Sequence, residues 1–360
     1  MIDGMDAALQ QYISSRVYRE ALGLPEGTSE EYRLLAQGEY NRNYAFIHPV
    51  TGRELVLRVN HGSQMHLDHQ IEYEANALRH IAASGRTPSV IFADGSEAAP
   101  GGGVLVMDKL PGHMLDYLKA DELKGAAQCL ADIHSIRIDP EETIAAAPDR
   151  IPPDADRLIS PQGSMKAILS ECEDMLAVYL ASELPEPDKK KRLRALLDDA
   201  WKLVGEKKEP PYRCCINTEL NSTNFLADRT DGVFVRLVDW EKPLYGDPAQ
   251  DLSHFLAPTT TFWKTDVIFD GQTVDSFIDD YIKAAAGRFD TAGIRERTLA
   301  MIPVTCLRGM TWCAMAWVQY RTADKAIINE STDEKLGQYL DDSFISMIED
   351  RIREALKGIK

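Results

Sequence analysis

Three polar residues near position 220 have types and spacing that suit phosphoryl transfer. Glu219 precedes Asn224 by five residues in I-N-T-E-L-N-S-T-N-F-L, and Asp239 ends the apolar run V-R-L-V-D that follows. Phosphoryl transfer requires a group that orients the attacking hydroxyl and oxygen ligands for the metal that neutralises the phosphates. We therefore interpret Glu219 as a candidate base and Asn224 and Asp239 as candidate magnesium ligands.

Each of these residues also has an ordinary structural interpretation. Asp239 alone fits a solvated strand end, and Asn224 lies in N-S-T-N, a composition typical of turns. Glu219 alone fits a residue that only binds a cationic substrate, or one with no role. A glutamate carboxylate also sits roughly 1 Å further out than that of an aspartate, which can cost on the order of 10²-fold in rate if the loop does not adjust. The combined spacing and the flanking strands favour the functional interpretation.

A second group of candidates lies upstream and suits phosphate binding. Gly38 and Asn41 lie in Q-G-E-Y-N-R-N-Y, where a glycine hairpin would cover the phosphates, although most glycines only turn the chain. Alternation in the strand at 55–59 places Arg58 on the face opposite to three apolar side chains. Arg58 would contact phosphate oxygens in a bidentate manner. Glu74, which borders the apolar stripe of the next helix, is its candidate partner.

The elements that would position these residues are mostly strands in the first third of the chain and helices afterwards. Strands are expected at 34–37, 44–47, 55–59, 90–92 and 104–107, with one helix within residues 1–30 and a second at 66–84. Later helices are expected at 121–135, 163–183, 188–205, 274–286, 295–321 and 333–357, around a strand-rich island at 213–239. The polar link D-K-L-P-G-H separates a predicted N-terminal unit, residues 1–110, from a helical unit, residues 111–360.

The overall charge and the cysteines exclude several function classes. The formal net charge is −17, from 40 Lys and Arg against 57 Asp and Glu, which disfavours nucleic acid and membrane surfaces as partners. An acidic cleft that attracts an amine-bearing substrate is a second interpretation of the same charge. The six cysteines form no C-x-x-C pair, so we expect reduced, mostly buried thiols in a cytoplasmic protein. His134, at the end of a helix, is expected to be structural.

The segments together resemble the aminoglycoside phosphotransferase / choline kinase family, which has a protein-kinase-like fold. The similarity covers roughly residues 34 to 256, and the order and spacing of its segments make it specific. It is carried by Q-G-E-Y-N-R-N-Y-A-F, V-L-R-V, E-Y-E-A-N-A-L, V-L-V-M-D-K-L-P-G, L-A-D-I-H, N-T-E-L-N-S-T-N-F-L and V-D-W-E-K-P-L-Y-G-D-P-A-Q-D-L.

The resemblance implies a two-lobed α+β fold, with a small antiparallel β-rich N-lobe and a larger, mainly helical C-lobe. It implies Mg-ATP as the phosphoryl donor and a small molecule with a hydroxyl as the acceptor. The backbone of the lobe hinge would face the adenine, and that hinge consists of Met107, Asp108, Lys109 and Leu110.

The resemblance also assigns roles to the polar candidates. Arg58 takes the phosphate-contacting position with Glu74 as its partner, and Asn224 and Asp239 take the magnesium positions. Asp251, in D-P-A-Q-D-L, takes the position of a buried aspartate that supports the catalytic loop.

The chain departs from the family pattern at N-T-E, where H-G-D is usual. Asn217 can still hydrogen-bond the neighbouring backbone, whereas Thr218 replaces a permissive glycine and stiffens the loop. That altered backbone would let the longer Glu219 fit, or the three changes mark a loss of catalysis. Two alternatives therefore stay open beside an active kinase: a nucleotide-binding pseudokinase-like module, and a helical interaction protein built on the C-terminal helices.

Overall fold

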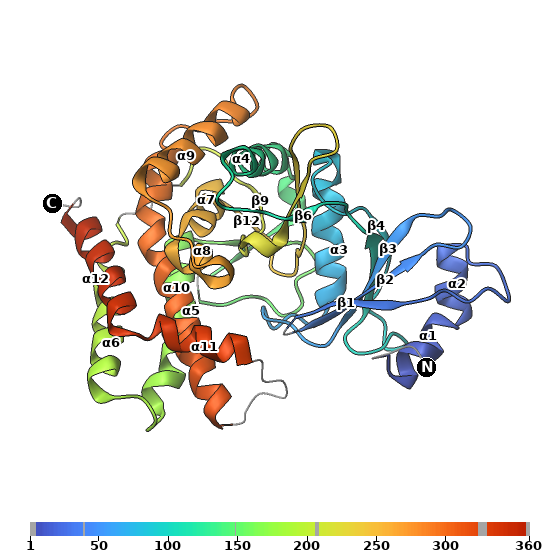
Figure 1. Cartoon of the computed structure of the whole chain (residues 1–360), viewed down its shortest axis with the longest axis horizontal. Helices are drawn as coiled ribbons and strands as arrows, with labels where there is room; N and C mark the ends of the chain where they lie inside the picture. The colour runs from blue at the N-terminus through green and yellow to red at the C-terminus, as the bar shows by residue number, and fades with distance from the viewer. Residues whose placement is uncertain (1–4, 39, 148, 206–208, 323–329, 358–360) are drawn as a thin grey trace.

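The computed structural model describes residues 5–38, 40–147, 149–205, 209–322 and 330–357. An antiparallel β-sheet with three helices forms the N-terminal region, and the remainder is largely helical (Figure 1). The α+β arrangement expected from the sequence is therefore confirmed.

The N-terminal sheet has five strands, and every neighbouring pair is antiparallel. Helices cover both of its faces, with α1 and α2 on one side and α3 on the other (Figure 1). Across the sheet the strands are β1 (Arg33–Gln37), β2 (Asn41–Ile47), β3 (Glu54–Asn60), β5 (Val104–Asp108) and β4 (Val90–Asp94). The helices are α1 (Ala7–Ile13), α2 (Arg16–Leu22) and α3 (Gln70–Ile81).

Alternation along β3 sorts its side chains between the two faces. Leu55, Leu57 and Val59 are buried in the small core beneath α1 and α2. Val56 belongs to the main core on the side of α3, and Arg58 on the same side is only 4% exposed. The predicted orientation of Arg58, away from the Leu/Val face, is confirmed.

The C-terminal part consists mainly of helices with short strands inserted between them. The helices are α4 (Ala120–His134), α5 (Ser164–Ala181), α6 (Pro187–Trp201), α7 (Pro248–Leu256), α8 (Pro258–Thr265), α9 (Gly271–Ala285), α10 (Ile294–Thr322), α11 (Glu330–Tyr339) and α12 (Asp342–Lys357). The paired strands are β6 (His113–Met114) with β10 (Phe225–Asp228) and β11 (Phe234–Leu237), β9 (Cys214–Ile216) with β12 (Leu244–Gly246), and the parallel pair β7 (Thr143–Ala146) and β8 (Leu158–Pro161).

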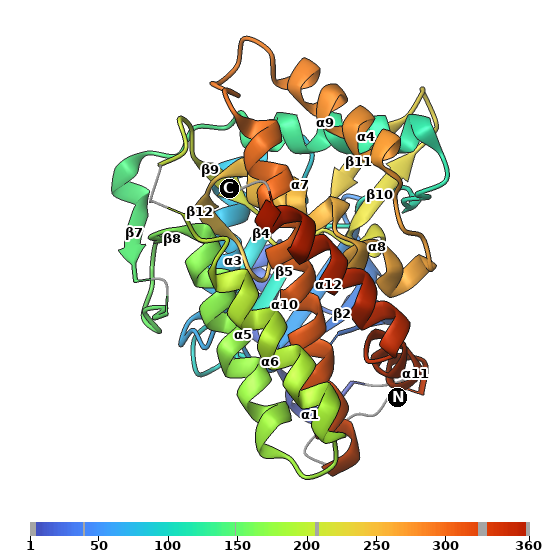
Figure 2. The ribbon, with the colours of Figure 1, turned by 90° about the vertical axis from the view of Figure 1, so that its left-hand side faces the viewer.

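Helix α10 forms the centre of this helical part. It packs against α5 and α7, with α6 and α12 alongside (Figure 2). Within the described residues it is the one helix long and apolar enough to pass a test for a membrane span, but 67% of the tested window is buried inside the protein. A helix buried to this extent is typical of the core of a folded protein.

Three expectations about helices were wrong. The predicted helix at 333–357 is two helices, because α12 starts afresh where the backbone carbonyl of Asp341 accepts the N–H of Ile345. The N-terminal helix is also two, since the Ser15 hydroxyl accepts the N–H of Tyr18 and begins α2. Helices α7 and α8 were missed, although Asp247 caps α7 and each helix has a proline in its first turn. All six cysteines are free and buried, as expected.

Gly112, in the link that follows the sheet, should tolerate no side chain. Its φ is +127°, and an added Cβ would lie 3.0 Å from the backbone of Ala227 in β10. We expect Gly112→Ala to lower the free energy of unfolding by about 2–4 kcal/mol, because backbone strain and overpacking add. The control is Gly232→Ala, where φ is +86° and the space is open, with an expected loss of about 1–2 kcal/mol. Equal losses in urea unfolding would contradict this assignment.

Candidate active site

Asp251 anchors the loop that leaves β9. Its carboxylate is fully buried and accepts the backbone N–H groups of Asn217 and Thr218, each at 2.8 Å. The Nε2 of His134 lies 3.1 Å from the same carboxylate, and the Nδ1 lies 2.8 Å from the hydroxyl of Tyr281. Both nitrogens of His134 are thus engaged in the core, as expected for a structural histidine.

The loop brings the three candidates of the 219–239 segment together. The side-chain amide of Asn217 donates to the backbone carbonyl of Asp239 at 2.8 Å, and its oxygen accepts the N–H of Glu219 at 3.0 Å. Asn224 donates its amide to the carbonyl of Glu219 at 2.7 Å. The backbone carbonyl of Asn224 accepts the N–H of Val238 at 2.8 Å. Asn217 therefore holds the neighbouring backbone, as the sequence suggested.

Two residues of the site adopt left-handed backbone conformations. Thr218 has φ +70° and Asp239 has φ +64°. This conformation costs a non-glycine residue roughly 1–2 kcal/mol, and it is unusual for a β-branched residue. The Thr218 hydroxyl donates to the carbonyl of Lys242 at 2.8 Å, so hydrogen bonds hold a threonine in a conformation that glycine would adopt freely.

Glu219 lies among buried charges. The Nη2 of Arg308 is 3.5 Å from its Oε1. Burial raises the pKa of Glu219, and Arg308 and Lys242 oppose that rise. Glu171 lies between the same two cations, with its Oε1 2.6 Å from Lys242 Nζ and its Oε2 3.0 Å from Arg308 Nε. Although burial raises the pKa of Glu171, Arg308 and Lys242 hold it at about 2.

Arg58 connects the sheet to Asp239. Its Nη1 lies 2.5 Å from Glu74 Oε1, its Nη2 lies 3.0 Å from Asp239 Oδ1, and its Nε donates to Asn43 Oδ1 at 3.0 Å. Burial raises the pKa of Glu74, and Arg58 is the principal group that opposes it. The predicted pairing of Arg58 with Glu74 is present, and the same guanidinium reaches the predicted metal ligand.

Glu241 belongs to this site but was not predicted from the sequence. Asn41, at the start of β2, donates its amide to the Glu241 carboxylate. Burial and the nearby Asp239 and Glu219 raise the pKa of Glu241 to about 9. Gly38 is exposed and donates its N–H to the Asn41 carbonyl at 2.9 Å, so it shapes the hairpin that brings Asn41 to the site. The available signal was the second acidic residue of V-D-W-E.

Two of the predicted hinge residues have side chains engaged elsewhere. Asp108 pairs with Arg53 at 2.5 Å, and Lys109 pairs with Glu54 at 2.8 Å. The backbone N–H of Lys109 also donates to the Glu54 carbonyl at 3.0 Å. Their side chains are therefore engaged by Arg53 and Glu54, where β3 begins, so these two residues would meet a ligand through their backbone groups.

The flanking hinge residues differ from these two. Met107 is buried in β5, in register with Val56 of β3. In the described chain, the N–H of the half-buried Leu110 has no backbone partner, and Pro111, which follows it, has no N–H. A short stretch of backbone without hydrogen-bond partners therefore begins at Leu110.

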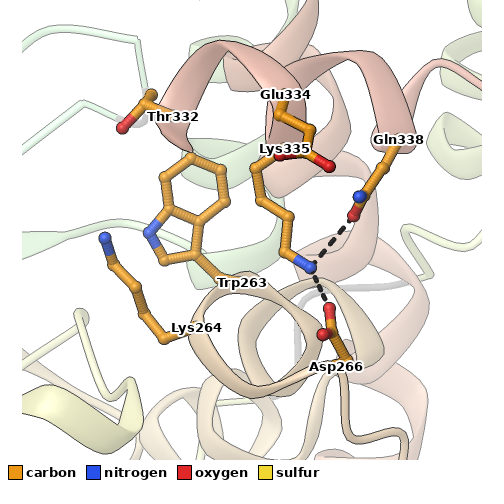
Figure 3. Close-up of a pocket in the computed structure, with 7 residues that line it drawn as sticks. All are labelled: Trp263, Lys264, Asp266, Thr332, Glu334, Lys335 and Gln338. Carbon is orange, nitrogen blue, oxygen red and sulfur yellow. Dashed lines mark hydrogen bonds and ion pairs between the residues drawn. The ribbon is translucent and has the colours of Figure 1, made fainter. Parts of the chain in front are cut away.

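A cavity of about 310 Å³ lies between α8 and α11 (Figure 3). Its lining residues are Trp263, Lys264, Asp266, Thr332, Glu334, Lys335 and Gln338. The ammonium of Lys335 contacts Asp266 and donates to Gln338 at 3.0 Å. The Trp263 ring meets that of Trp312 on α10 edge-on, with centroids 5.4 Å apart. The cavity lining is therefore backed by α10, one helical turn beyond Arg308.

Comparison with known proteins gives one family and one fold. The model of the phosphotransferase enzyme family matches residues 31–297. No curated relative matches the sequence.

Among solved structures the chain is similar to Plasmodium vivax ethanolamine kinase, with a TM-score of 0.62 and 12% identity over 98% of this chain and 97% of that one. It is similar to choline kinase from Cryptosporidium parvum, with a TM-score of 0.60 and 12% identity over 95% of both chains. A spectinomycin phosphotransferase solved with ADP and spectinomycin gives a TM-score of 0.60 and 10% identity over 91% of this chain and 93% of that one. These likenesses confirm the predicted kinase-like fold.

His254 should make the folded site sensitive to acid. Its Nδ1 accepts the backbone N–H of Leu220 at 3.0 Å. Burial, with Arg308 and Lys242 nearby, lowers the pKa of His254 from 6.5 to about 3. Between these values the unfolded chain binds a proton that the folded chain excludes. The free energy of unfolding should therefore fall as pH drops through this window, by up to about 1.4 kcal/mol per pH unit.

The substitution His254→Gln tests this dependence. The glutamine oxygen can still accept the Leu220 N–H but takes up no proton. Urea unfolding between about pH 6 and about pH 4 should show a shallower pH slope than the unsubstituted protein. The exposed His69 provides the control, since His69→Gln should leave the slope unchanged. Identical slopes for all three proteins would refute the role of His254.

Proposed function

Because the chain belongs to the phosphotransferase enzyme family, we propose that it transfers the γ-phosphoryl group of ATP to a hydroxyl of a small molecule. The observation that supports this most directly is the convergence on Asp239. Arg58 of the sheet and Asn217 of the catalytic loop both contact Asp239, and Asn224 lies in the same network. Groups suited to phosphate, metal and hydroxyl therefore meet at one place.

The residues around Asp239 fit a magnesium ion. Carboxylate and amide oxygens are ligands that Mg²⁺ accepts, and it is often held by one or two carboxylates together with substrate phosphates. Asp239 and Asn224 would supply such oxygens, and Glu241 adds a third beside them. Burial and the neighbouring acids raise the pKa of Glu241, and a bound cation would favour its charged form.

The proposed reaction assigns a separate task to each side chain. Bound magnesium would neutralise charge on the phosphates. Arg58 would contact phosphate oxygens and is held ready by Glu74. Glu219 would accept the proton of the acceptor hydroxyl while a bond forms from that oxygen to the γ-phosphorus. The bond from the γ-phosphorus to the bridging oxygen of ADP then breaks, and Glu219 returns its proton to solvent.

We further propose that residues 1–110 form the nucleotide-covering lobe and residues 111–360 the acceptor lobe. The hairpin with Gly38 and Asn41 would lie over the phosphates. Backbone groups of the 107–110 segment would face the adenine, with the N–H of Leu110 as a donor. The six buried, free thiols fit a reducing cytoplasm.

The acceptor is proposed to enter from the side of α8, α10 and α11. The cavity there, at about 310 Å³, is near the lower end of the range for ligand sites. The Trp263 ring in its lining packs against Trp312 of α10, the helix that also carries Arg308, which contacts Glu219. The net charge of −17 favours an amine-bearing acceptor over an acidic one.

Glu219→Gln tests whether the site is active. The glutamine cannot take up the hydroxyl proton, so ADP release should fall by roughly 10²–10⁴-fold. Binding of Mg-ATP, measured as a rise in melting temperature, should be retained. The assay is ADP release from Mg-ATP across a panel of amino alcohols, sugars and aminoglycosides. Glu354→Gln, at an exposed ion pair on α12, is the matched control and should keep full activity.

Each contrary outcome has a distinct meaning. ADP release that Glu219→Gln does not lower would overturn the base assignment. A protein that binds Mg-ATP but releases no ADP with any acceptor is a nucleotide-binding module. If Mg-ATP does not raise the melting temperature, the remaining alternative is an interaction protein built on the C-terminal helices.

A further inference from the structure

Arg308, on the central helix α10, has no role in the proposed reaction described so far. Its guanidinium meets two of the three residues that depart from the family pattern, with Nη2 3.5 Å from the Glu219 carboxylate and Nη1 donating to the Thr218 carbonyl at 3.4 Å. We propose that Arg308 is a positioning residue that lets a glutamate serve where the family pattern has an aspartate. This inference rests on the proposed function.

The guanidinium is itself held in a fixed orientation. Its Nε donates to Glu171 Oε2 at 3.0 Å, and its Nη2 lies 3.5 Å from Glu171 Oε1. Glu171 is held in turn by Lys242 Nζ at 2.6 Å. The side chain of Arg308 is only 13% exposed. A planar fork fixed on one edge presents its remaining N–H groups in a defined direction, here toward the loop.

The elements that carry this arrangement are rigid. Arg308 and Glu171 come from α10 and α5, which pack against each other in the main core (Figure 2). Groups on packed helices hold a site more closely than groups on loops. The helical core, and not the loop alone, therefore fixes the position of the Glu219 carboxylate.

The same cluster stabilises the left-handed Thr218. The Thr218 carbonyl accepts from Arg308, and its hydroxyl donates to the Lys242 carbonyl. Its N–H donates to Asp251. All three polar groups of Thr218 are therefore fixed, which accounts for a β-branched residue at φ +70°. Arg308 thus compensates for both the missing glycine and the longer acid.

Length is the physical basis of the proposal. An aspartate at position 219 would withdraw the carboxylate by roughly 1 Å. Starting from 3.5 Å, that retreat breaks the contact with Arg308. The usual family residue should therefore work less well in this chain than the glutamate, so Glu219→Asp is expected to lower turnover by about 10-fold or more.

The decisive experiment is a double-mutant cycle between Arg308 and Glu219. Turnover is measured as ADP release from Mg-ATP, with the acceptor from the substrate panel, or with water when the panel gives none. Arg308→Met should lower kcat by about 10–100-fold and leave KM for ATP within about twofold. In the Glu219→Gln background the same change should cost less than about threefold, because the group to be positioned is gone.

A conservative variant and a matched control complete the design. Arg308→Lys keeps a cation beside Glu171 but loses the fork, so its kcat should lie between those of the unsubstituted protein and Arg308→Met; if Arg308→Met does not fold, the cycle is run with Arg308→Lys. Arg295→Met, which removes contacts with Asp275 and Asp279 at the N-terminal end of α10, should leave kcat unchanged. The thermal shift with Mg-ATP verifies that each variant is folded.

The outcomes separate this inference from the proposed function. Equal losses on Arg308→Met with and without Glu219→Gln, in a protein that releases ADP, would overturn the positioning role alone. Full turnover in Glu219→Asp would do the same. Absence of ADP release from the unsubstituted protein would overturn the proposed function, and the positioning role with it.

Discussion

The geometry of the site depends on one buried carboxylate. Asp251 accepts two consecutive backbone N–H groups, from Asn217 and Thr218, at the start of the catalytic loop. Burying a charge is costly unless it is hydrogen-bonded on most sides, and here backbone donors and His134 satisfy it. Because the two N–H groups are fixed, the left-handed turn at Thr218 is fixed as well. That turn directs Asn217 toward Asp239 and Glu219 toward Arg308.

The balance of charge around Asp239 explains why the two halves of the chain meet there. Asp239, Glu241 and Glu74 lie close together, and Arg58 is the cation from the sheet that joins them. Burial, together with the nearby Asp239 and Glu219, raises the pKa of Glu241 to about 9. The folded protein therefore concentrates acidic groups at the position where we propose that a metal–phosphate group binds.

Much of this could be predicted from the sequence because it is encoded locally. Period-two alternation in β3 gave the direction of Arg58, and the helical stripe of α3 placed Glu74 beside it. The spacing within 217–239 brought Glu219, Asn224 and Asp239 into one candidate site. Each inference needed only a short window and the standard geometry of strands and helices.

The parts that escaped prediction depend on packing between distant segments. Arg308 and Glu171 come from two helices whose mutual orientation no local pattern specifies. The division between α11 and α12 escaped for a related reason: apolar spacing runs through it, while the break itself lies in backbone hydrogen bonding at Asp341. Glu241 was present in the quoted motif, but its closeness to Asn41 arises only when the sheet lies over the loop.

The placement of two residues on α10 has a consequence for how this protein can evolve. Arg308 and Trp312 lie one helical turn apart on the same buried helix. Arg308 contacts the proposed base, and Trp312 packs against Trp263 in the lining of the α8–α11 cavity. If the acceptor binds in this cavity as proposed, a substitution that reshapes the cavity would also shift the turn that carries the guanidinium. Selectivity and speed would then be inherited together, and lineages that change acceptor should show paired replacements at these two positions.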